Sequence, residues 1–367
     1  MSSSISPHAI APANVLRGSG AWGESLSLIA ELSQKPFVLG RSAATADLRQ
    51  KLKSDLEVTG LSVAAGELEF DCCEQDLQRL AAEITASGCD AVLAAGGGKV
   101  LDAGKLLANR LGLTCITVPT SAATCAGWTA LANIYSPQGA FEGDVALRHC
   151  PELLIFDHDL VVQAPARTLA SGIADAMAKW YEASVSSSSS TDGLVQQAVQ
   201  QARVLRDQLL LEGVEAIERP GAEAWQRVAE ASGLTAGLIG GIGGARCRTV
   251  AAHAVHNGLT QLAACHGVLH GEKVGFGILV QLRLEEQLGG SQLAAQARRQ
   301  LFSFFRQLQL PVSLEELGLS GASLQELQEV CRFACRDGSD LHHLPFAVSP
   351  DDLLSALVSS SQGCLTH

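Results

Sequence analysis

The first 160 residues alternate between short apolar runs and longer amphipathic stretches. A run of five or six apolar residues bounded by turn residues predicts a buried strand, and apolar positions spaced by three and four predict a helix. This pattern predicts strands at 36–40, 61–65, 90–95 and 114–118, with helices at 45–56, 74–87 and 100–111 between them. Because strands alternate with helices, we expect a parallel, doubly wound sheet in an α/β domain.

Beyond Pro165 the strand signals stop and helical periodicity takes over. The expected helices span 167–184, 194–211, 222–239, 249–265, 272–287 and 291–307. We therefore place a boundary near Leu160, between an α/β domain (1–160) and an all-helical domain (161–367). The serine-rich stretch 184–191 is expected to form an exposed loop between two helices.

The composition agrees with two domains and argues against several classes of partner. A chain of 367 residues exceeds what one hydrophobic core usually organises, and its 47% of hydrophobic residues can fill two. With 26 Lys and Arg against 38 Asp and Glu, the formal charge is −12, which disfavours nucleic acid and anionic membranes as partners. No apolar run reaches the roughly 18–20 residues of a membrane-spanning helix, so we expect no membrane contact.

The eleven cysteines and the N-terminus bear on the cellular compartment. The cysteines are irregularly spaced and include no CxxC pair, so a zinc ribbon is not expected. The first residues, MSSSI, lack the basic and apolar regions of a signal peptide. We expect a cytoplasmic protein whose thiols are mostly buried and reduced.

Three glycines, Gly96, Gly97 and Gly98, follow the third predicted strand and lead into a helix with Lys99 and Asp102 in its first turns. Glycines let the backbone approach a pyrophosphate closely, and a helix N-terminus offers unpaired N–H groups. The spacing matches neither GxGxxG nor a Walker P-loop. Tight packing at a strand–helix corner is the competing interpretation of the glycines, and for Asp102 we favour a structural role over one in orienting Lys99.

A second polar loop follows the next predicted strand. Thr120, Ser121 and Thr124 place three hydroxyls within five residues. The carboxyl ends of neighbouring parallel strands converge at the edge where ligands bind. Both loops are therefore expected to line one cleft, although hydroxyls at these positions also serve as turn and cap residues.

Four histidines lie within 18 positions of an apolar region: His253, His256, His266 and His270. A single buried histidine is usually structural, whereas a cluster makes metal coordination an equal alternative. Asp175 places one carboxylate inside a strongly apolar helix, and a buried carboxylate needs a partner. Two imidazoles and one carboxylate with an open position suit Zn²⁺, or alternatively Fe²⁺, acting as a Lewis acid.

Several long segments together resemble the metal-dependent, or iron-containing, alcohol dehydrogenase superfamily on its glycerol dehydrogenase branch. The resemblance covers nearly the whole chain, and TCAGWTALANIY and LHHLPFAVSPDDL are most similar to the bacterial hydroxycarboxylate dehydrogenase A type. It implies a dehydroquinate synthase-like fold, in which a dinucleotide-binding α/β domain and an all-α domain flank a cleft with the metal. The other segments that carry it are GGGKVLDAGK, LASGIADAMAKWYEA, AAHAVHNGLT and LHGEKVGFGILVQ.

The resemblance assigns roles at the metal. It implies that Asp175, His253 and His270 hold one divalent ion, and that His256 lies beside the metal or the substrate. The implied reaction is reversible hydride transfer between NAD(P)H and a carbonyl carbon whose oxygen is polarised by the metal. Either His256 or a chain of waters would relay the proton.

The resemblance also assigns the cofactor site. Asp102 and Ser121 lie in the same two loops as the matching residues and are included with them. The positions that match the family's pyrophosphate and further cofactor contacts are Gly97, Gly98, Lys99, Thr120, Thr129, Leu131 and Tyr135. The family also implies a homo-oligomer that acts on a small-molecule substrate.

Two departures from the family pattern affect the chemistry. Cys125 stands where glycerol dehydrogenases carry an aspartate near the substrate, so an anionic 2-oxo or 2-hydroxy acid is more easily admitted, with Cys125 shaping the pocket. Arg41 stands where an acidic residue usually holds the adenosine ribose, so we expect NADP to be accepted. The alternatives are an NAD-linked glycerol dehydrogenase, a lyase like dehydroquinate synthase, and a nucleotide-binding protein without activity.

Overall fold

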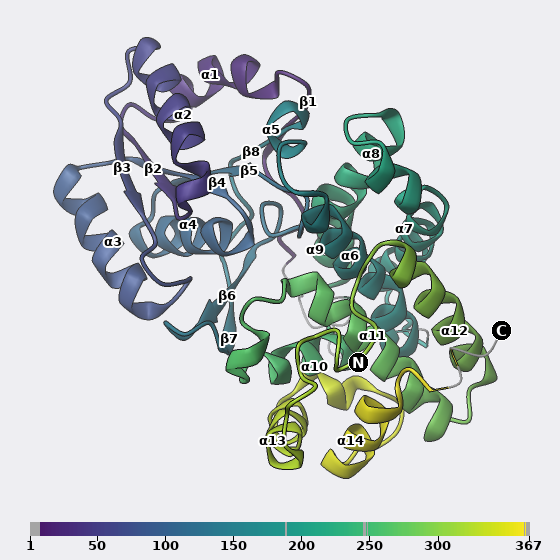
Figure 1. Ribbon diagram of the computed structural model, residues 1–367. Coiled ribbons are helices and arrows are strands. Elements are labelled where there is room, and N and C mark those ends of the chain that lie inside the picture. The colour runs from purple at the N-terminus through teal and green to yellow at the C-terminus, as the bar shows by residue number, and fades with distance from the viewer. Residues whose placement is uncertain (1–7, 188, 245–246, 248, 363, 365–367) are drawn as a thin grey trace.

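A parallel sheet organises the first half of the chain. In this computed structural model, which describes residues 8–187, 189–244, 247, 249–362 and 364, six described strands pair in the order β1-β8-β5-β4-β2-β3, all parallel (Figure 1). The strands are β1 (Asn14–Gly18), β2 (Pro36–Gly40), β3 (Ala64–Glu67), β4 (Ala91–Gly96), β5 (Thr114–Pro119) and β8 (Leu153–Asp157). The predicted sheet is thus confirmed and extended by two strands, although the strand expected at 61–65 is formed at Ala64–Glu67.

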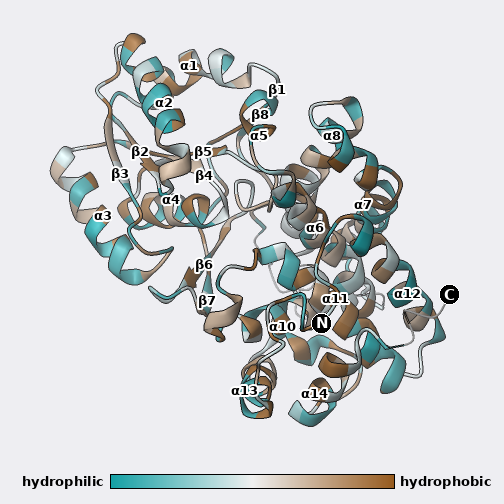
Figure 2. Cartoon of the chain, viewed as in Figure 1, coloured by the Kyte–Doolittle hydropathy of each residue, from teal (hydrophilic) through white to brown (hydrophobic). Residues whose placement is uncertain are grey.

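Helices cover both faces of this sheet, which explains why its central strands are apolar throughout. Val38 and Leu93 pack on one face with α1 (Ala21–Leu32) and α2 (Ala46–Val58). The alternate residues Phe37 and Val92 face α3 (Glu74–Ser87) and α4 (Gly98–Leu111) on the other. In Figure 2 the outward turns of α3 carry hydrophilic residues, whereas the strands between the helices are mainly hydrophobic.

The second half is helical and contains two hydrophobic clusters. One cluster joins α6, α7, α9, α11 and α12, and the other joins α10, α11, α13 and α14, so α11 contributes to both. The helices are α5 (His158–Val161), α6 (Ala166–Ser187), α7 (Gly193–Glu218), α8 (Glu223–Glu230), α9 (Ala236–Gly243), α10 (Ala251–Leu259), α11 (His270–Gln287), α12 (Gln292–Gln307), α13 (Leu324–Ala334) and α14 (Pro350–Ser359). Among the described residues, no helix has the length and apolar character needed to cross a membrane.

Several elements differ from those expected. The sequence pattern missed β1, β8 and the antiparallel hairpin of β6 (Leu131–Tyr135) and β7 (Phe141–Ala146). The helix expected at 222–239 is interrupted by a π-helical segment, Ala231–Thr235. The loop expected at 184–191 is wrong in its first part, because α6 continues to Ser187 and the side chain of Ser187 is buried.

Candidate active site

A cleft of about 400 Å³ runs between the two halves of the molecule at the carboxyl ends of the sheet strands. Arg41 and Ser42 line one end of it, and Asp175, His253 and His270 line the other. The glycine turn and the loop after β5 lie between these ends. The structure thus brings both predicted loops and the predicted metal ligands to one cavity.

The space around the glycine turn shows which of its glycines is required by packing. Strand β4 ends at Gly96, and α4 begins at Gly98. A Cβ at Gly96 would lie 2.8 Å from Cβ of Val100, so packing alone explains this glycine. A Cβ at Gly97 would meet no atom within 4 Å. Packing therefore does not account for Gly97, which lines the cleft and leaves room for a ligand.

A buried aspartate that the sequence analysis missed lies beside this turn. Asp71 follows β3, is 2% exposed in its side chain and forms an ion pair with Lys99. Arg41 Nη1 lies 3.9 Å from the same carboxylate. Asp71 lies in the loop after β3, four residues beyond Glu67, and the sequence around it gives no signal of a site. Lys99 also lies over the ring of Tyr135, with its Nζ 4.9 Å from the ring centroid.

Asp102 has a structural environment that fits the role favoured from the sequence. Its Oδ1 lies 3.0 Å from Nζ of Lys105, and its Oδ2 accepts a hydrogen bond from the backbone N–H of Asn133. Lys105 in turn donates to the carbonyl oxygens of Thr129 and Leu131. This network ties α4 to β6 and fixes the cleft wall, while Lys99 pairs with Asp71.

The other predicted cofactor residues line the same cleft. Thr120 is linked to the glycine turn, because its backbone N–H donates to the carbonyl of Gly96 over 3.1 Å. The remaining ones are Ser121 after β5, Thr129 before β6, and Leu131 and Tyr135 within β6.

Three side chains from three helices converge at the far end of the cleft. Asp175 comes from the middle of α6, His253 from the first turn of α10, and His270 is the first residue of α11. The Nε2 atom of His253 lies 3.4 Å from Oδ1 of Asp175, and the Nε2 atom of His270 lies 3.2 Å from the same oxygen. One ligand atom from each lies within 4.8 Å of the others. Two imidazoles and a carboxylate at this spacing fit a divalent cation.

The charges in this triad support metal binding. Burial alone would raise the pKa of Asp175, but the charge of His270 and hydrogen bonds from both histidines hold it well below the usual range. Burial likewise would lower the pKa of His253, yet Glu182 and Asp175 raise it to about 9. A divalent cation at this position would compete with protons for the imidazole nitrogens and the carboxylate.

Glu182 orients His253 and was also missed by the sequence analysis. It lies seven residues beyond Asp175 on α6, with a fully buried side chain. Its carboxylate accepts hydrogen bonds from Nδ1 of His253 at 2.6 Å and from the backbone N–H of His253 at 3.0 Å. With Nδ1 donating to Glu182, Nε2 is left facing Asp175, which is the tautomer that a metal ligand needs.

His256 and Cys125 lie beside the triad. The ring centroid of His256 is 4.2 Å from that of His270, and it lines a second cavity of about 180 Å³ behind the histidines. Burial, with the charge of His270 next, lowers the pKa of His256 well below its usual value, so its imidazole is neutral. Cys125 lines the main cleft, and burial raises the pKa of its thiol.

Comparison with known proteins assigns the family. The profile of the iron-containing alcohol dehydrogenases matches residues 12–158. An uncharacterised oxidoreductase of Synechocystis is 52% identical over 98% of this chain and 95% of its own. Hydroxycarboxylate dehydrogenase A of Escherichia coli is 33% identical over 95% of each chain. The chain belongs to the iron-containing alcohol dehydrogenase family.

The family assignment agrees with the fold and the cleft. The crystal structure of a probable glycerol dehydrogenase from Sinorhizobium meliloti superimposes with a TM-score of 0.86 at 28% identity, covering 97% of this chain and 99% of that one. The protein is therefore an oxidoreductase of this family that acts on small-molecule alcohols. Membership implies NAD(P) and a divalent metal, and the Asp175–His253–His270 group is a possible site for that metal.

Proposed function

We propose that this family member interconverts small 2-oxo acids and 2-hydroxy acids with NADP(H), using a divalent metal held by Asp175, His253 and His270. The observation that carries the proposal is the convergence of this triad with the glycine turn on one cleft. The substrate class is supported by the similarity to hydroxycarboxylate dehydrogenase A and by the neutral thiol at Cys125. We further propose Zn²⁺, with Fe²⁺ as the alternative.

Each part of the cleft has a role in this proposal. The Gly97–Lys99 turn binds the pyrophosphate of the cofactor at the N-terminus of α4. When bound, the divalent cation polarises the substrate carbonyl for hydride exchange with the nicotinamide ring. His256 donates its Nδ1 proton to the side-chain oxygen of Asn257 over 2.9 Å, and either the free Nε2 of this weakly basic imidazole or a chain of waters relays the proton. The buried helices around the triad limit the access of water.

The function is tested by a substrate panel on the protein stripped of metal by chelation and reloaded with Zn²⁺ or Fe²⁺. We expect NADPH oxidation with pyruvate and 2-oxobutyrate to exceed that with dihydroxyacetone, and to disappear after chelation. The structural similarity to the probable glycerol dehydrogenase favours a second candidate, which fast turnover of dihydroxyacetone and glycerol would select. A protein that binds metal without redox turnover would point to a lyase. A protein that neither binds metal nor turns over NADPH would point to a binding protein.

Arg41 is expected to set the cofactor preference. It lines the cleft with Ser42 at the end of β2, where an adenosine ribose would lie, and its side chain is 37% exposed. The nearby carboxylate of Asp71 is already engaged by Lys99. Replacing Arg41 with aspartate should lower the NADPH/NADH ratio of kcat/KM by roughly 10- to 100-fold, because a charge-assisted bond to the 2′-phosphate becomes a repulsion.

The matched control for this cofactor prediction is Lys51→Gln. Lys51 is a cation on α2 that pairs with Asp55 at 2.6 Å, and it does not line the cleft. The control should leave the ratio unchanged. Tight NADH binding by the wild type together with an unchanged ratio in Arg41→Asp would refute the role of Arg41.

The cellular setting completes the proposal. The structure leaves all eleven cysteines as free thiols, which supports a reducing cytoplasm. Val204 and Leu211 expose apolar side chains seven residues apart on α7, as a surface that contacts a second copy would do. We propose a cytoplasmic homo-oligomer built from a cofactor domain (1–160) and a metal domain (161–367).

A further inference from the structure

A buried lysine lies at the metal end of the cleft, outside the roles described so far. Lys179 is on α6, one helical turn beyond Asp175, and it is 6% exposed. It lines the cleft together with Cys125, Asp175 and His253. Lysine is rarely buried to this extent without a functional or structural need for its charge.

The cations of the cleft are divided between its two ends. Among the described residues that line it, the side chains with a permanent positive charge are Arg41, Lys99 and Lys179. Arg41 and Lys99 lie together at the cofactor end, beside Asp71. Lys179 is therefore the cation that a substrate at the triad would meet.

The charges around the triad favour an anion there. A divalent cation brings two positive charges, and the carboxylates of Asp175 and Glu182 bring two negative ones. Asp102 and Lys105 form a separate neutral pair at 3.0 Å. Lys179 brings a positive charge to the cleft wall one helical turn from Asp175, and an anionic group beside it would be attracted.

Cys125 faces the same region with an uncharged side chain. Burial raises the pKa of its thiol, while the nearby charge of Lys179 acts in the opposite direction. Cys125 and Lys179 both line the main cleft. The wall opposite α6 thus contributes no carboxylate at this position, and it leaves space for one from a ligand.

We propose that the ammonium group of Lys179 binds the carboxylate of the substrate and thereby selects 2-oxo and 2-hydroxy acids over neutral carbonyl compounds and polyols. This inference rests on the proposed function, because it assigns specificity within the same site. Lys179 and Asp175 are one helical turn apart on α6. A substrate whose carboxylate is bound by Lys179 would therefore have its adjacent carbonyl carbon near the triad.

Arg336 is the competing receptor for a carboxylate, because it lines the second cavity beside His256. Its surroundings make it the weaker candidate. Its guanidinium carbon lies 4.0 Å from the ring centroid of Phe333, and the residue is exposed. Asp144 and Asp340 line the same cavity and offset its charge. The charge of that cavity therefore does not favour an anion.

The test compares pyruvate with pyruvamide, its neutral analogue of nearly the same shape, in the metal-loaded enzyme with NADPH. For Lys179→Met, kcat/KM should fall roughly 10- to 100-fold for pyruvate, mainly through KM, because a charge-assisted hydrogen bond is lost. Turnover of pyruvamide should change little, and Lys179→Arg should restore part of the preference. Calorimetric titration of oxamate into the NADP⁺ complex, with and without metal, should show the same loss of affinity.

Two further variants keep the test decisive. Arg336→Gln should leave the pyruvate/pyruvamide ratio unchanged, and a loss in this variant alone would transfer the role to Arg336. Cys125→Asp places a carboxylate near Lys179 and should lower the ratio even if Lys179→Met does not fold. Equal losses for both compounds in Lys179→Met, or an unchanged ratio in Cys125→Asp, would overturn the inference. Wild-type enzyme that reduces neither compound would instead overturn the proposed function.

Discussion

Replacing Asp175 with asparagine should release the bound metal and lower kcat by about 10³-fold or more. Asp175 is the charged ligand of the triad and contacts both histidines from a buried position. A neutral amide keeps the shape of the side chain but loses the attraction to a divalent cation. A Lewis acid contributes several kcal/mol to the barrier reduction, and each ~1.4 kcal/mol is tenfold in rate. Metal content after dialysis against Zn²⁺ and steady-state turnover measure the effect.

The control for Asp175→Asn is the same type of change at Glu285. This carboxyl lies on α11, and burial raises its pKa to about 7, so the change to an amide removes less negative charge near neutral pH than the same change at Asp175. Glu285→Gln should retain one metal per chain. Glu182→Gln should weaken metal affinity by roughly 10- to 100-fold, because the tautomer of His253 is no longer enforced. A metal-loaded, active Asp175→Asn variant would refute the assignment of the triad.

The parts of the fold that the sequence predicted have local causes. Strands β2 and β4 are buried along their whole length and are uninterrupted apolar runs, and β5 is buried from Cys115 to Pro119 with Thr117 as its buried polar residue. The helices α3 and α4 carry an apolar stripe against the sheet and end at Gly88 and Gly112, both in the left-handed conformation. Each signal lies within its own segment and can be read without knowledge of the tertiary structure.

Two of the missed elements, β1 and the β6–β7 hairpin, depend on partners far away in the sequence, whereas β8 is a buried apolar run that the pattern analysis overlooked. Among the described strands, β1 has β8 as its one partner, and the paired residues Asn14 and Leu153 lie 139 positions apart. The residues of β1 are partly exposed, so its apolar pattern is weak. The hairpin β6–β7 mixes apolar, small and polar residues without a regular alternation, and β6 docks on α4. Without the fold, neither segment shows a strand pattern strong enough to predict.

The same distinction separates the site residues. The triad was predicted because a cluster of histidines in an apolar region is unusual and because the family motifs carry it. Glu182 and Asp71 were missed, since a single carboxylate in a helix or loop gives no signal by itself. Their roles arise from partners at a distance, His253 for Glu182 and Lys99 for Asp71.

A methyl group at Gly271 should destabilise the protein by about 3 kcal/mol or more and displace His270. Helices α6 and α11 cross closely here, and a Cβ at Gly271 would lie 1.8 Å from the carbonyl oxygen of Ser171. The Gly271 N–H also donates to the Ser171 hydroxyl over 3.0 Å. Because the obstructing atom belongs to the backbone, no change of rotamer relieves the overlap, and the helices must separate.

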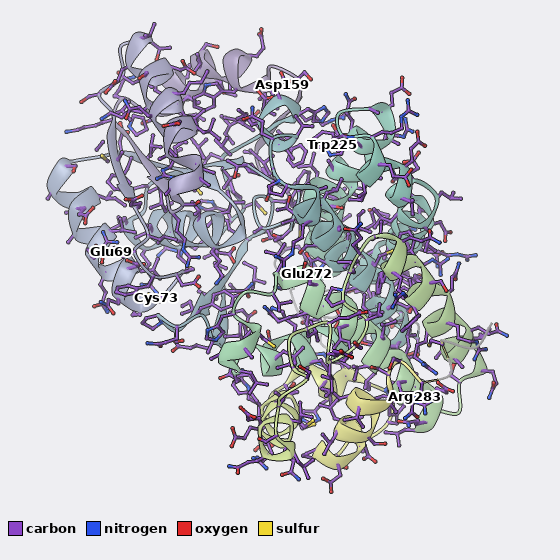
Figure 3. All side chains as sticks on the ribbon, viewed as in Figure 1. Glu69, Cys73, Asp159, Trp225, Glu272 and Arg283 are labelled. Carbon is purple, nitrogen blue, oxygen red and sulfur yellow. The ribbon has the colours of Figure 1, made fainter. Side chains whose placement is uncertain are left out.

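Separation of α6 and α11 would disturb the metal site, because Glu272, the residue after Gly271, also links these two helices. Glu272, near the centre of the molecule in Figure 3, binds Arg167 at the start of α6 through two hydrogen bonds of 2.5 Å and 2.7 Å. Asp175 lies on one helix and His270 on the other, so Gly271→Ala should lower both the free energy of unfolding in urea and the metal affinity. Gly267→Ala is the control, since a Cβ there meets nothing within 4 Å, and should change stability by at most about 0.5 kcal/mol. Equal behaviour of the two variants would show that the helix crossing does not hold the triad in place.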